Sequence, residues 1–380
     1  MAQKTPGAAP AAGGASAQRR AAILAHDRFG PLTSKTAIAL IRYGRDRVVA
    51  VIDRSKQEAD ASEYIGSHGE GIPVVPSMVD ALAHHPQVLY YGIAPEGGGL
   101  PDHDRAEMLE ALRAGVDVAC GMHVFLEDDP VLAKAAKLSG ARIWDVRRPP
   151  KRRRLVSGDG MFVASPVVYV SGTDCSTGKM TVAVELAREA QRRGLRAAFV
   201  ATGQSGMMIG CDAGAPIDAI PGDFMAGEVE ALVLEVAARA PAPDIIFVEG
   251  QASLQHPAYG AVTLALLEGS FPRAVVMCHH PGRTHFKAFR EGGRFHPRLP
   301  PISKEIALTE QLLEGTTGGR VVAIATMATE DDPDEEARHE AMLRSRVGLP
   351  VADVFRDGPG PLLDAVLAAV RPSPHRRPGG

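Results

Sequence analysis

One stretch near the middle of the chain, Val167-Val-Tyr-Val-Ser-Gly-Thr-Asp-Cys-Ser-Thr-Gly-Lys-Met-Thr181, constrains the fold more than any other feature. The β-branched and aromatic run at its start is typical of a buried strand, and residues 180–190 have helical spacing. Between them lie small residues and the pair Gly178-Lys179. A strand, a glycine-bounded loop, a lysine and a helix in this order predict a phosphate-binding P-loop.

The prediction has an electrostatic basis. A tight turn into a helix directs several backbone N–H groups into one concavity, where the helix terminus adds roughly half a positive charge. Lys179 adds a full charge, so a di- or triphosphate is the expected ligand. We expect the cofactor to be bound by Gly172, Thr173, Asp174, Cys175, Ser176, Thr177, Gly178, Lys179, Met180 and Thr181.

The loop departs from the common P-loop pattern at two positions. Gly172 lies one residue too early for G-x-x-x-x-G-K, and Met180 stands where a serine or threonine ordinarily binds Mg²⁺. We therefore expect no metal if the ligand is not a nucleoside triphosphate. If it is ATP with Mg²⁺, the expected ligands are Thr181, Asp223 and Glu249.

Composition limits the class of protein. Of the 380 residues, 45% are hydrophobic and 23% charged, and the net charge is −3, which is typical of a globular protein without affinity for nucleic acid. The four cysteines are far apart, and no apolar run has membrane-spanning length, so we expect a cytoplasmic protein without membrane contact. Residues 1–20 and 371–380 are expected to be disordered tails.

Strand and helix patterns alternate along both halves of the chain, which predicts an α/β protein with parallel sheets. We expect a Rossmann-like domain at 21–150, a basic linker at 151–160 and a P-loop NTPase-like, doubly wound domain at 161–370. The first turn, 25–31, lacks G-x-G-x-x-G, so no dinucleotide site is predicted there. Asp53 is interpreted as a turn or cap residue, with contact to a ribose as the alternative.

In open parallel sheets ligands bind at the carboxyl ends of the strands. Glu249 ends a predicted strand and is a candidate base or water-orienting group. The glycine-rich segment 202–210 is expected to be a loop close to a ligand, where Gln204 and Ser205 bind substrate. Asp223 is a candidate metal ligand or helix cap.

A further candidate segment, Cys278-His-His-Pro-Gly-Arg-Thr-His-Phe-Lys287, is basic. Its histidines do not have the spacing of a zinc site, and its cations favour an anionic substrate. We expect Arg283, with Lys287, to hold substrate carboxylates. His279 and His280 are candidate bases near neutral pH.

These motifs together, Gly172-Thr-Asp-Cys-Ser-Thr-Gly-Lys-Met-Thr181, Glu249-Gly-Gln and Cys278-His-His-Pro-Gly-Arg283, resemble the DgcN-like family over nearly the whole chain. That family was long catalogued as a domain of unknown function. The resemblance implies a Rossmann-like domain followed by a P-loop domain. It also implies N-acetylation of D-glutamate with acetyl-CoA, as part of D-amino-acid catabolism.

The P-loop by itself is also similar to that of dethiobiotin synthetase, which implies ATP, but Met180 departs from that pattern. Three functions are therefore weighed. The leading one is amino-acid N-acetylation, with Glu249, His279 or His280 as base and the phosphates of acetyl-CoA in the P-loop. The alternatives are an ATP-dependent ligase or kinase and a nucleotide-binding regulator. A small-molecule substrate and a homo-oligomer are expected.

Overall fold

The computed structural model describes residues 18–31, 33–56, 59–95, 99–289, 293–327 and 333–370. The chain folds into two compact units, one of Met1–Pro150 with Gln204–Gly210 and one of Lys151–Gly203 with Cys211–Gly380. The predicted C-terminal tail, 371–380, and residues 1–17 of the predicted N-terminal tail lie outside the described residues. Residue 20, which the prediction placed in the first tail, is the first residue of β1 (Arg20–Leu24).

The first unit contains, in its described part, a seven-stranded sheet in the order β3-β4-β2-β1-β5-β6-β7. Neighbouring strands are parallel except β3 with β4. Apart from Arg20 and Arg47 at the starts of β1 and β2, the central strands are apolar, as expected where helices cover both faces of a parallel sheet. The strands are β1 (Arg20–Leu24), β2 (Arg47–Ile52), β3 (Ala59–Asp60), β4 (Pro73–Val75), β5 (Val88–Tyr91), β6 (Asp117–Cys120) and β7 (Ile143–Asp145).

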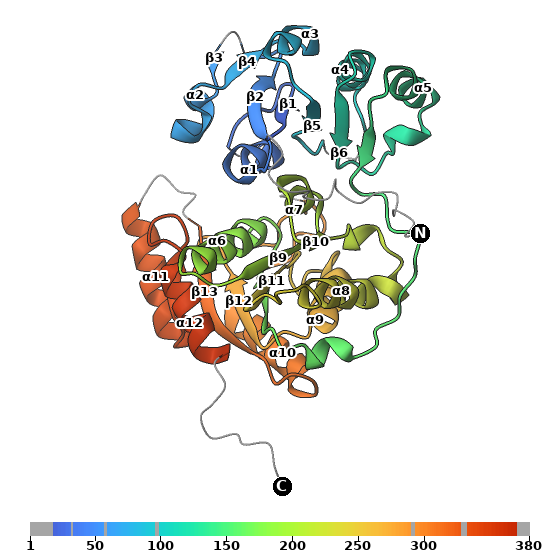
Figure 1. Ribbon diagram of the computed structural model, residues 1–380. Helices are drawn as coiled ribbons and strands as arrows, with labels where there is room; N and C mark the ends of the chain where they lie inside the picture. The colour runs from blue at the N-terminus through green and yellow to red at the C-terminus, as the bar shows by residue number, and fades with distance from the viewer. Residues whose placement is uncertain are drawn as a thin grey trace. The chain divides into compact units, whose positions relative to one another are not determined.

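The helices of this unit begin and end at residues suited to those positions. Asp129 accepts hydrogen bonds from Val131 and Leu132 N–H at the start of α5, and Gly140, with φ 80°, ends it. The helices are α1 (Lys35–Tyr43), α2 (Ser62–Ile65), α3 (Met78–Ala81), α4 (Asp102–Arg113) and α5 (Pro130–Ser139), with 3-10 turns at Gly66–Gly69, Leu82–His84 and Leu126–Asp128 (Figure 1).

Helix α7 (Gln204–Ile209) corrects the expectation of a loop at 202–210, and it belongs to the first unit although the predicted domain at 161–370 included it. It packs against α1, and Met207, Met208 and Ile209 are buried. The glycines at 203, 206 and 210 favoured a loop in the sequence. Burial of three apolar side chains outweighs this local preference.

The second unit contains a parallel sheet in the order β10-β9-β11-β8-β12-β13-β14. Strand β8 is central, and the chain continues from it to β9 and β11 on one side and then to β12 on the other. Such a reversal of strand order marks the usual ligand site of an open sheet. The strands are β8 (Val167–Gly172), β9 (Ala197–Ala201), β10 (Ala213–Gly214), β11 (Ile245–Glu249), β12 (Ala274–Cys278), β13 (Arg320–Thr326) and β14 (Val351–Asp353).

Helices cover both faces of this sheet (Figure 1). Alternate residues of β8, Val167 and Tyr169, share one core with Leu232 of α8 and Leu266 of α9. Helices α6 and α12 pack against each other outside that core, α6 on β8, β9 and β11 and α12 on β12 and β13. The helices are α6 (Lys179–Arg192), α8 (Gly222–Ala237), α9 (Gly260–Ser270), α10 (Ile302–Glu314), α11 (Pro333–Val347) and α12 (Gly360–Val370), with 3-10 turns at Asp159–Phe162 and Ile217–Ala219.

The Rossmann-like and P-loop α/β architecture expected from the sequence is confirmed. The expected linker at 151–160 is not a free connection, because Glu230 of α8 accepts hydrogen bonds from Ser157 N–H (2.5 Å) and Gly160 N–H (3.0 Å). No helix in the described part of the chain is long and apolar enough to cross a membrane.

Candidate functional site

The P-loop leaves β8 at Gly172 and enters α6 at Lys179. A Cβ on Gly172 would lie 2.7 Å from Thr177 Oγ1 and 2.9 Å from the lysine Nζ. Gly178 has φ 91°, in the left-handed region, and a Cβ there would clash with Met327. Glycine is therefore required at both ends of the turn. The turn leads into the first N–H groups of α6, which have no acceptor within the helix.

Lys179 lies folded inside the turn. Its ammonium donates to Asp174 O (2.5 Å) and Thr177 Oγ1 (3.2 Å), and the residue is only 7% exposed. Desolvation is the largest influence on it and lowers its pKa. Within the described part of the chain no carboxylate forms an ion pair with this ammonium. A bound phosphate would supply the missing counter-charge.

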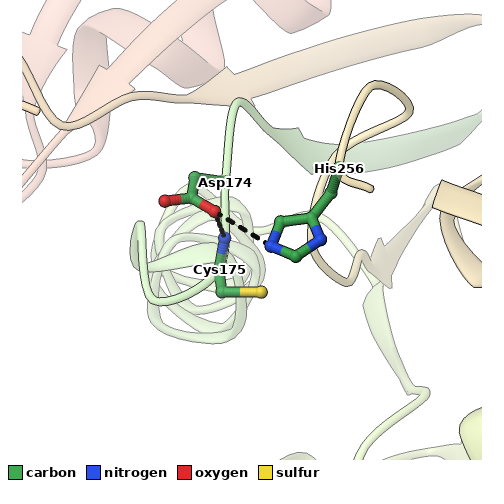
Figure 2. Close-up of side chains that lie close together, drawn as sticks. All are labelled: Asp174, Cys175 and His256. Atoms are coloured by element: carbon green, nitrogen blue, oxygen red, sulfur yellow. Dashed lines mark hydrogen bonds and ion pairs between the residues drawn. The ribbon is translucent and has the colours of Figure 1, made fainter. Parts of the chain in front are cut away.

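The buried carboxylate of Asp174 joins the P-loop to two other loops. It accepts hydrogen bonds from Cys175 N–H (2.7 Å), Lys287 N–H (2.8 Å) and Arg283 Nη1 (2.8 Å), and His256 Nε2 lies 3.5 Å away. The donors at 283 and 287 follow β12, and the histidine follows β11. One carboxylate therefore holds three segments that are distant in sequence together at the end of β8. Figure 2 shows the part of this arrangement formed by Asp174, Cys175 and His256.

Figure 2 also shows the thiol of Cys175 beside His256 and Asp174, and the ligand atoms of these three residues lie within 4.8 Å of one another. His256 Nδ1 accepts from the N–H groups of Ala258 (3.1 Å) and Tyr259 (3.3 Å), so the proton is on Nε2. Burial raises the pKa of the thiol, and a guanidinium already pairs with the carboxylate. These three side chains therefore connect neighbouring loops. With a protonated thiol and a carboxylate already paired to a guanidinium, they do not suit a metal cation.

Arg283 and His279 contact the P-loop from the segment after β12. Arg283 Nη1 donates to Cys175 O (2.5 Å) and its Nη2 to Ser176 O (3.4 Å). His279 Nδ1 lies 2.9 Å from Thr173 Oγ1. Burial, followed by neighbouring positive groups, lowers the pKa of His279 to about 4, so its imidazole is neutral at pH 7. Both residues thus lie beside the P-loop, and Arg283 also holds its backbone in place.

Glu249 ends β11, the neighbour of β8 in the sheet. Its Oε2 accepts from Thr202 N–H (3.1 Å) and Gly203 N–H (3.3 Å). Burial is the largest cause that raises its pKa to about 7, and the two N–H groups and Lys179 act in the opposite direction. Glu249 can therefore exchange a proton near neutral pH, which is a requirement for a general base.

The structure places the predicted substrate residues Gln204 and Ser205 in α7, within the first unit. Ser205 Oγ lies 2.7 Å from Thr36 Oγ1, and Gln204 Oε1 accepts from Arg147 Nη2 at 2.8 Å. Each therefore has a partner inside that unit. Their assignment to substrate binding stays a prediction.

The remaining predicted residues lie on known elements. Thr181 belongs to the first turn of α6, and Asp223 is exposed in the first turn of α8. No hydrogen bond among the described residues joins Thr181 or Asp223 to Glu249, and the metal set for ATP stays a prediction. His280 is half-buried, and the Lys287 side chain is exposed.

Sequence reasoning missed two residues that organise the site. His256 is one, as described above. The other is Glu305 in α10, which accepts from Leu254 N–H (2.6 Å) and Gln255 Nε2 (2.9 Å) and so holds the loop after β11. Burial raises the pKa of Glu305. Neither residue belongs to a motif, and only the position of His256 after a strand end was a signal.

Known proteins resemble this chain over both units. Residues 154–363 match a family model described as the DUF1611 P-loop domain of unknown function, and residues 54–149 match the accompanying Rossmann-like domain. A protein of Tritonibacter scottomollicae named D-glutamate N-acetyltransferase is 34% identical over 77% of this chain and 84% of its own length.

A second protein with that name, from Pseudoalteromonas, is 30% identical over 77% of this chain and 83% of its own length. Among solved structures, a DUF1611 family protein from Anabaena variabilis is 37% identical, with a TM-score of 0.84. The match covers 92% of this chain and 100% of that one. The similarity thus includes the P-loop unit and the Rossmann-like unit.

Proposed function

Because this chain belongs to the DUF1611 family, we propose that it is an N-acetyltransferase that transfers an acetyl group from acetyl-CoA to the amino group of D-glutamate. The observation that carries the proposal is its similarity, at 34% and 30% identity, to two proteins named D-glutamate N-acetyltransferase. A role in D-amino-acid catabolism is part of the same proposal.

The P-loop suits the phosphates of coenzyme A. The ammonium of Lys179 is buried without a paired carboxylate in the described part of the chain, and the first N–H groups of α6 lack acceptors within the helix. A diphosphate supplies charge and acceptors to both. Each charge-assisted hydrogen bond contributes about 1.5–3 kcal/mol. The nucleotide end of acetyl-CoA would be anchored in this way.

Glu249 is the proposed general base. With its pKa raised to about 7, the carboxyl group exchanges a proton near neutral pH and, when ionised, can take one from the substrate ammonium. The free amine then attacks the carbonyl carbon of the thioester, a C–N bond forms, and the C–S bond breaks. The sulfur leaves as the thiolate of coenzyme A and takes up the proton that the amine nitrogen loses.

Two further groups complete the proposed mechanism. Backbone N–H groups at a glycine-rich turn would stabilise the negative oxygen of the tetrahedral intermediate. Lys287, whose exposed side chain is on the loop that contacts Asp174, would bind a substrate carboxylate together with the outer N–H groups of Arg283. His279 has a pKa of about 4 and is the weaker candidate base.

The test is thiol release from acetyl-CoA in the presence of D-glutamate, with L-glutamate as the matched control for stereochemistry. We expect release with D-glutamate and a product whose mass is that of N-acetylglutamate. Phosphate release from ATP without thiol release would replace the proposal with the ligase or kinase alternative. Sedimentation of the same sample tests the predicted homo-oligomer.

A further inference from the structure

A cavity of about 880 Å³ lies in the second unit beside the P-loop. His279 and Arg283, which contact the P-loop, form part of its wall. The rest of the wall comes from residues 298–304, which lead into α10, and from α11. Its basic lining residues are Arg283, Arg298, Lys304 and Arg346, and two histidines, His279 and His339, also line it.

The charge of this cavity has one sign. No described residue that lines it is an aspartate or a glutamate. Arg298, Lys304 and Arg346 are exposed, and within the described part of the chain no hydrogen bond or ion pair engages their charged groups. Arg283 differs, because Asp174 and two P-loop carbonyl groups already bind it. A cluster of unpaired cations around a hollow raises the local concentration of anions.

The positive charge of Lys304 is repelled by the partial positive charge at the N-terminus of its own helix. It lies in the first turn of α10, whose N-terminus carries partial positive charge. A cation there is unfavourable for the helix, and the acidic residue of the same turn, Glu305, is buried and accepts hydrogen bonds from Leu254 and Gln255. A bound anion offsets the charge of Lys304 and that of the helix terminus together.

We propose that this cavity binds the adenosine 3′-phosphate end of coenzyme A, while the P-loop binds its diphosphate. The inference rests on the proposed use of acetyl-CoA. The volume of about 880 Å³ is far more than a small dicarboxylate fills and is within the range of sites that hold a nucleotide-sized ligand. The shared wall of His279 and Arg283 places the cavity next to the diphosphate site, as a single ligand requires.

The proposal gives the protein a means to distinguish coenzyme A from ATP. Both molecules carry a 5′-polyphosphate that a P-loop recognises, but only coenzyme A carries a 3′-phosphomonoester. We expect Arg298, Lys304 and Arg346 to bind this 3′-phosphate and so to select coenzyme A. The preference for the acyl donor then comes from this cavity, and the P-loop supplies affinity that both ligands share.

The experiment compares the affinities of coenzyme A and dephospho-coenzyme A by isothermal titration calorimetry. The variants are Lys304→Ala and Arg346→Ala, both at exposed positions whose replacement leaves the core intact. Arg338→Ala is the matched control, because Arg338 is an exposed arginine of the same helix as Arg346 and does not line the cavity. Lys304→Arg keeps the charge and serves as the conservative variant.

We expect the wild-type protein to prefer coenzyme A, and each alanine variant to bind it roughly tenfold more weakly while the affinity for dephospho-coenzyme A is unchanged. Arg338→Ala and Lys304→Arg should retain the preference. An equal loss for both ligands, or no loss for either, would overturn the inference. If the wild-type protein transfers acetyl groups in spite of such a result, the proposed function stands and only the cavity assignment fails.

Discussion

Each unit has a turn that leads from a buried central strand into a helix. The two turns differ in which groups accept hydrogen bonds from their backbone N–H groups. In the first unit, the turn after β1 is closed by Asp53, which is fully buried and accepts from Asp27 N–H (2.8 Å) and Phe29 N–H (3.0 Å). In the second unit, the carboxylate of Asp174 takes one loop amide and otherwise points to the segments after β11 and β12.

The comparison teaches that the fold alone does not make a phosphate site. Both turns lie at the carboxyl edge of a parallel sheet, where ligands commonly bind. The protein's own carboxylate occupies the first turn as a phosphate would. In the second turn, the buried carboxylate of Asp174 is directed at Arg283, Lys287 N–H and His256, and it does not pair with the ammonium of Lys179. The turn-residue interpretation of Asp53 agrees with this geometry.

The largest expected effect is on catalysis in the second unit. Glu249→Gln removes the proposed base while preserving the shape of the side chain, and we expect kcat to fall by roughly 10²- to 10⁴-fold. The wild-type rate should rise with pH through about 7, the pKa of Glu249, because the carboxyl group must lose its proton to act. The variant should lack this rise.

The control for that prediction is Glu305→Gln, since Glu305 is also a buried glutamate whose pKa burial raises. It should retain the rise near pH 7. A rate that instead rises through about pH 4 would identify His279 as the base, because that is the pKa at which its imidazole becomes neutral. The pH profile of kcat/KM is the measurement.

The next effect in size is on the stability of the second unit. Asp174→Asn leaves the Arg283 guanidinium without its buried carboxylate partner, and breaking such a pair costs about 3–5 kcal/mol. Urea denaturation measures the loss. Asp223→Asn, at an exposed position, is the matched control and should change stability little. Equal stability of the two variants would show that the carboxylate at 174 does not hold the loops.

A smaller effect is expected in the first unit. Asp53→Ala leaves the N–H groups of Asp27, Phe29 and Ser55 without this acceptor. Only the bond from Phe29 is buried, and its loss costs about 1–3 kcal/mol. Denaturation of the first unit should shift, and the affinity for coenzyme A should not. A loss of coenzyme A affinity in this variant would break the comparison, because the first turn would then contribute to binding.

The smallest expected effect is the stabilisation of the Asp53→Ala variant by inorganic phosphate. If the carboxylate of Asp53 occupies the place of a phosphate, inorganic phosphate should stabilise Asp53→Ala more than it stabilises the wild-type protein. With phosphate at about tenfold its dissociation constant, the expected gain is about 1.4 kcal/mol. Thermal unfolding with and without phosphate provides the measurement, and chloride at equal ionic strength is the control. Identical shifts for the two proteins would contradict the idea.

The fold class and the P-loop were predictable from the sequence because their signals are local. The buried strands are continuous apolar runs, and the P-loop needs glycine at 172 and 178 and a lysine at the helix start within one short segment. The signals for helix starts are equally local, as where Asp129 caps α5 directly before Pro130. In these places one stretch of chain contains both partners of the interaction.

The unpredicted features depend on partners that are distant in the sequence. Arg283 was expected to face substrate, yet it pairs with Asp174, 109 residues away. The segment 204–209 is helical because its apolar side chains are buried in the first unit, not because of its own composition. The pKa of Glu249 likewise depends on burial that no local pattern reveals.

The most direct test of the account is calorimetric titration of coenzyme A into the wild-type protein and Lys179→Ala, with Arg338→Ala as control. Since the ammonium of Lys179 is buried and its desolvation is costly, we expect the variant to unfold at an unchanged or higher temperature. We expect it to bind coenzyme A at least about a hundredfold more weakly, the loss of two charge-assisted hydrogen bonds. Unchanged affinity in a folded Lys179→Ala protein would contradict the claim that this turn holds a phosphorylated ligand.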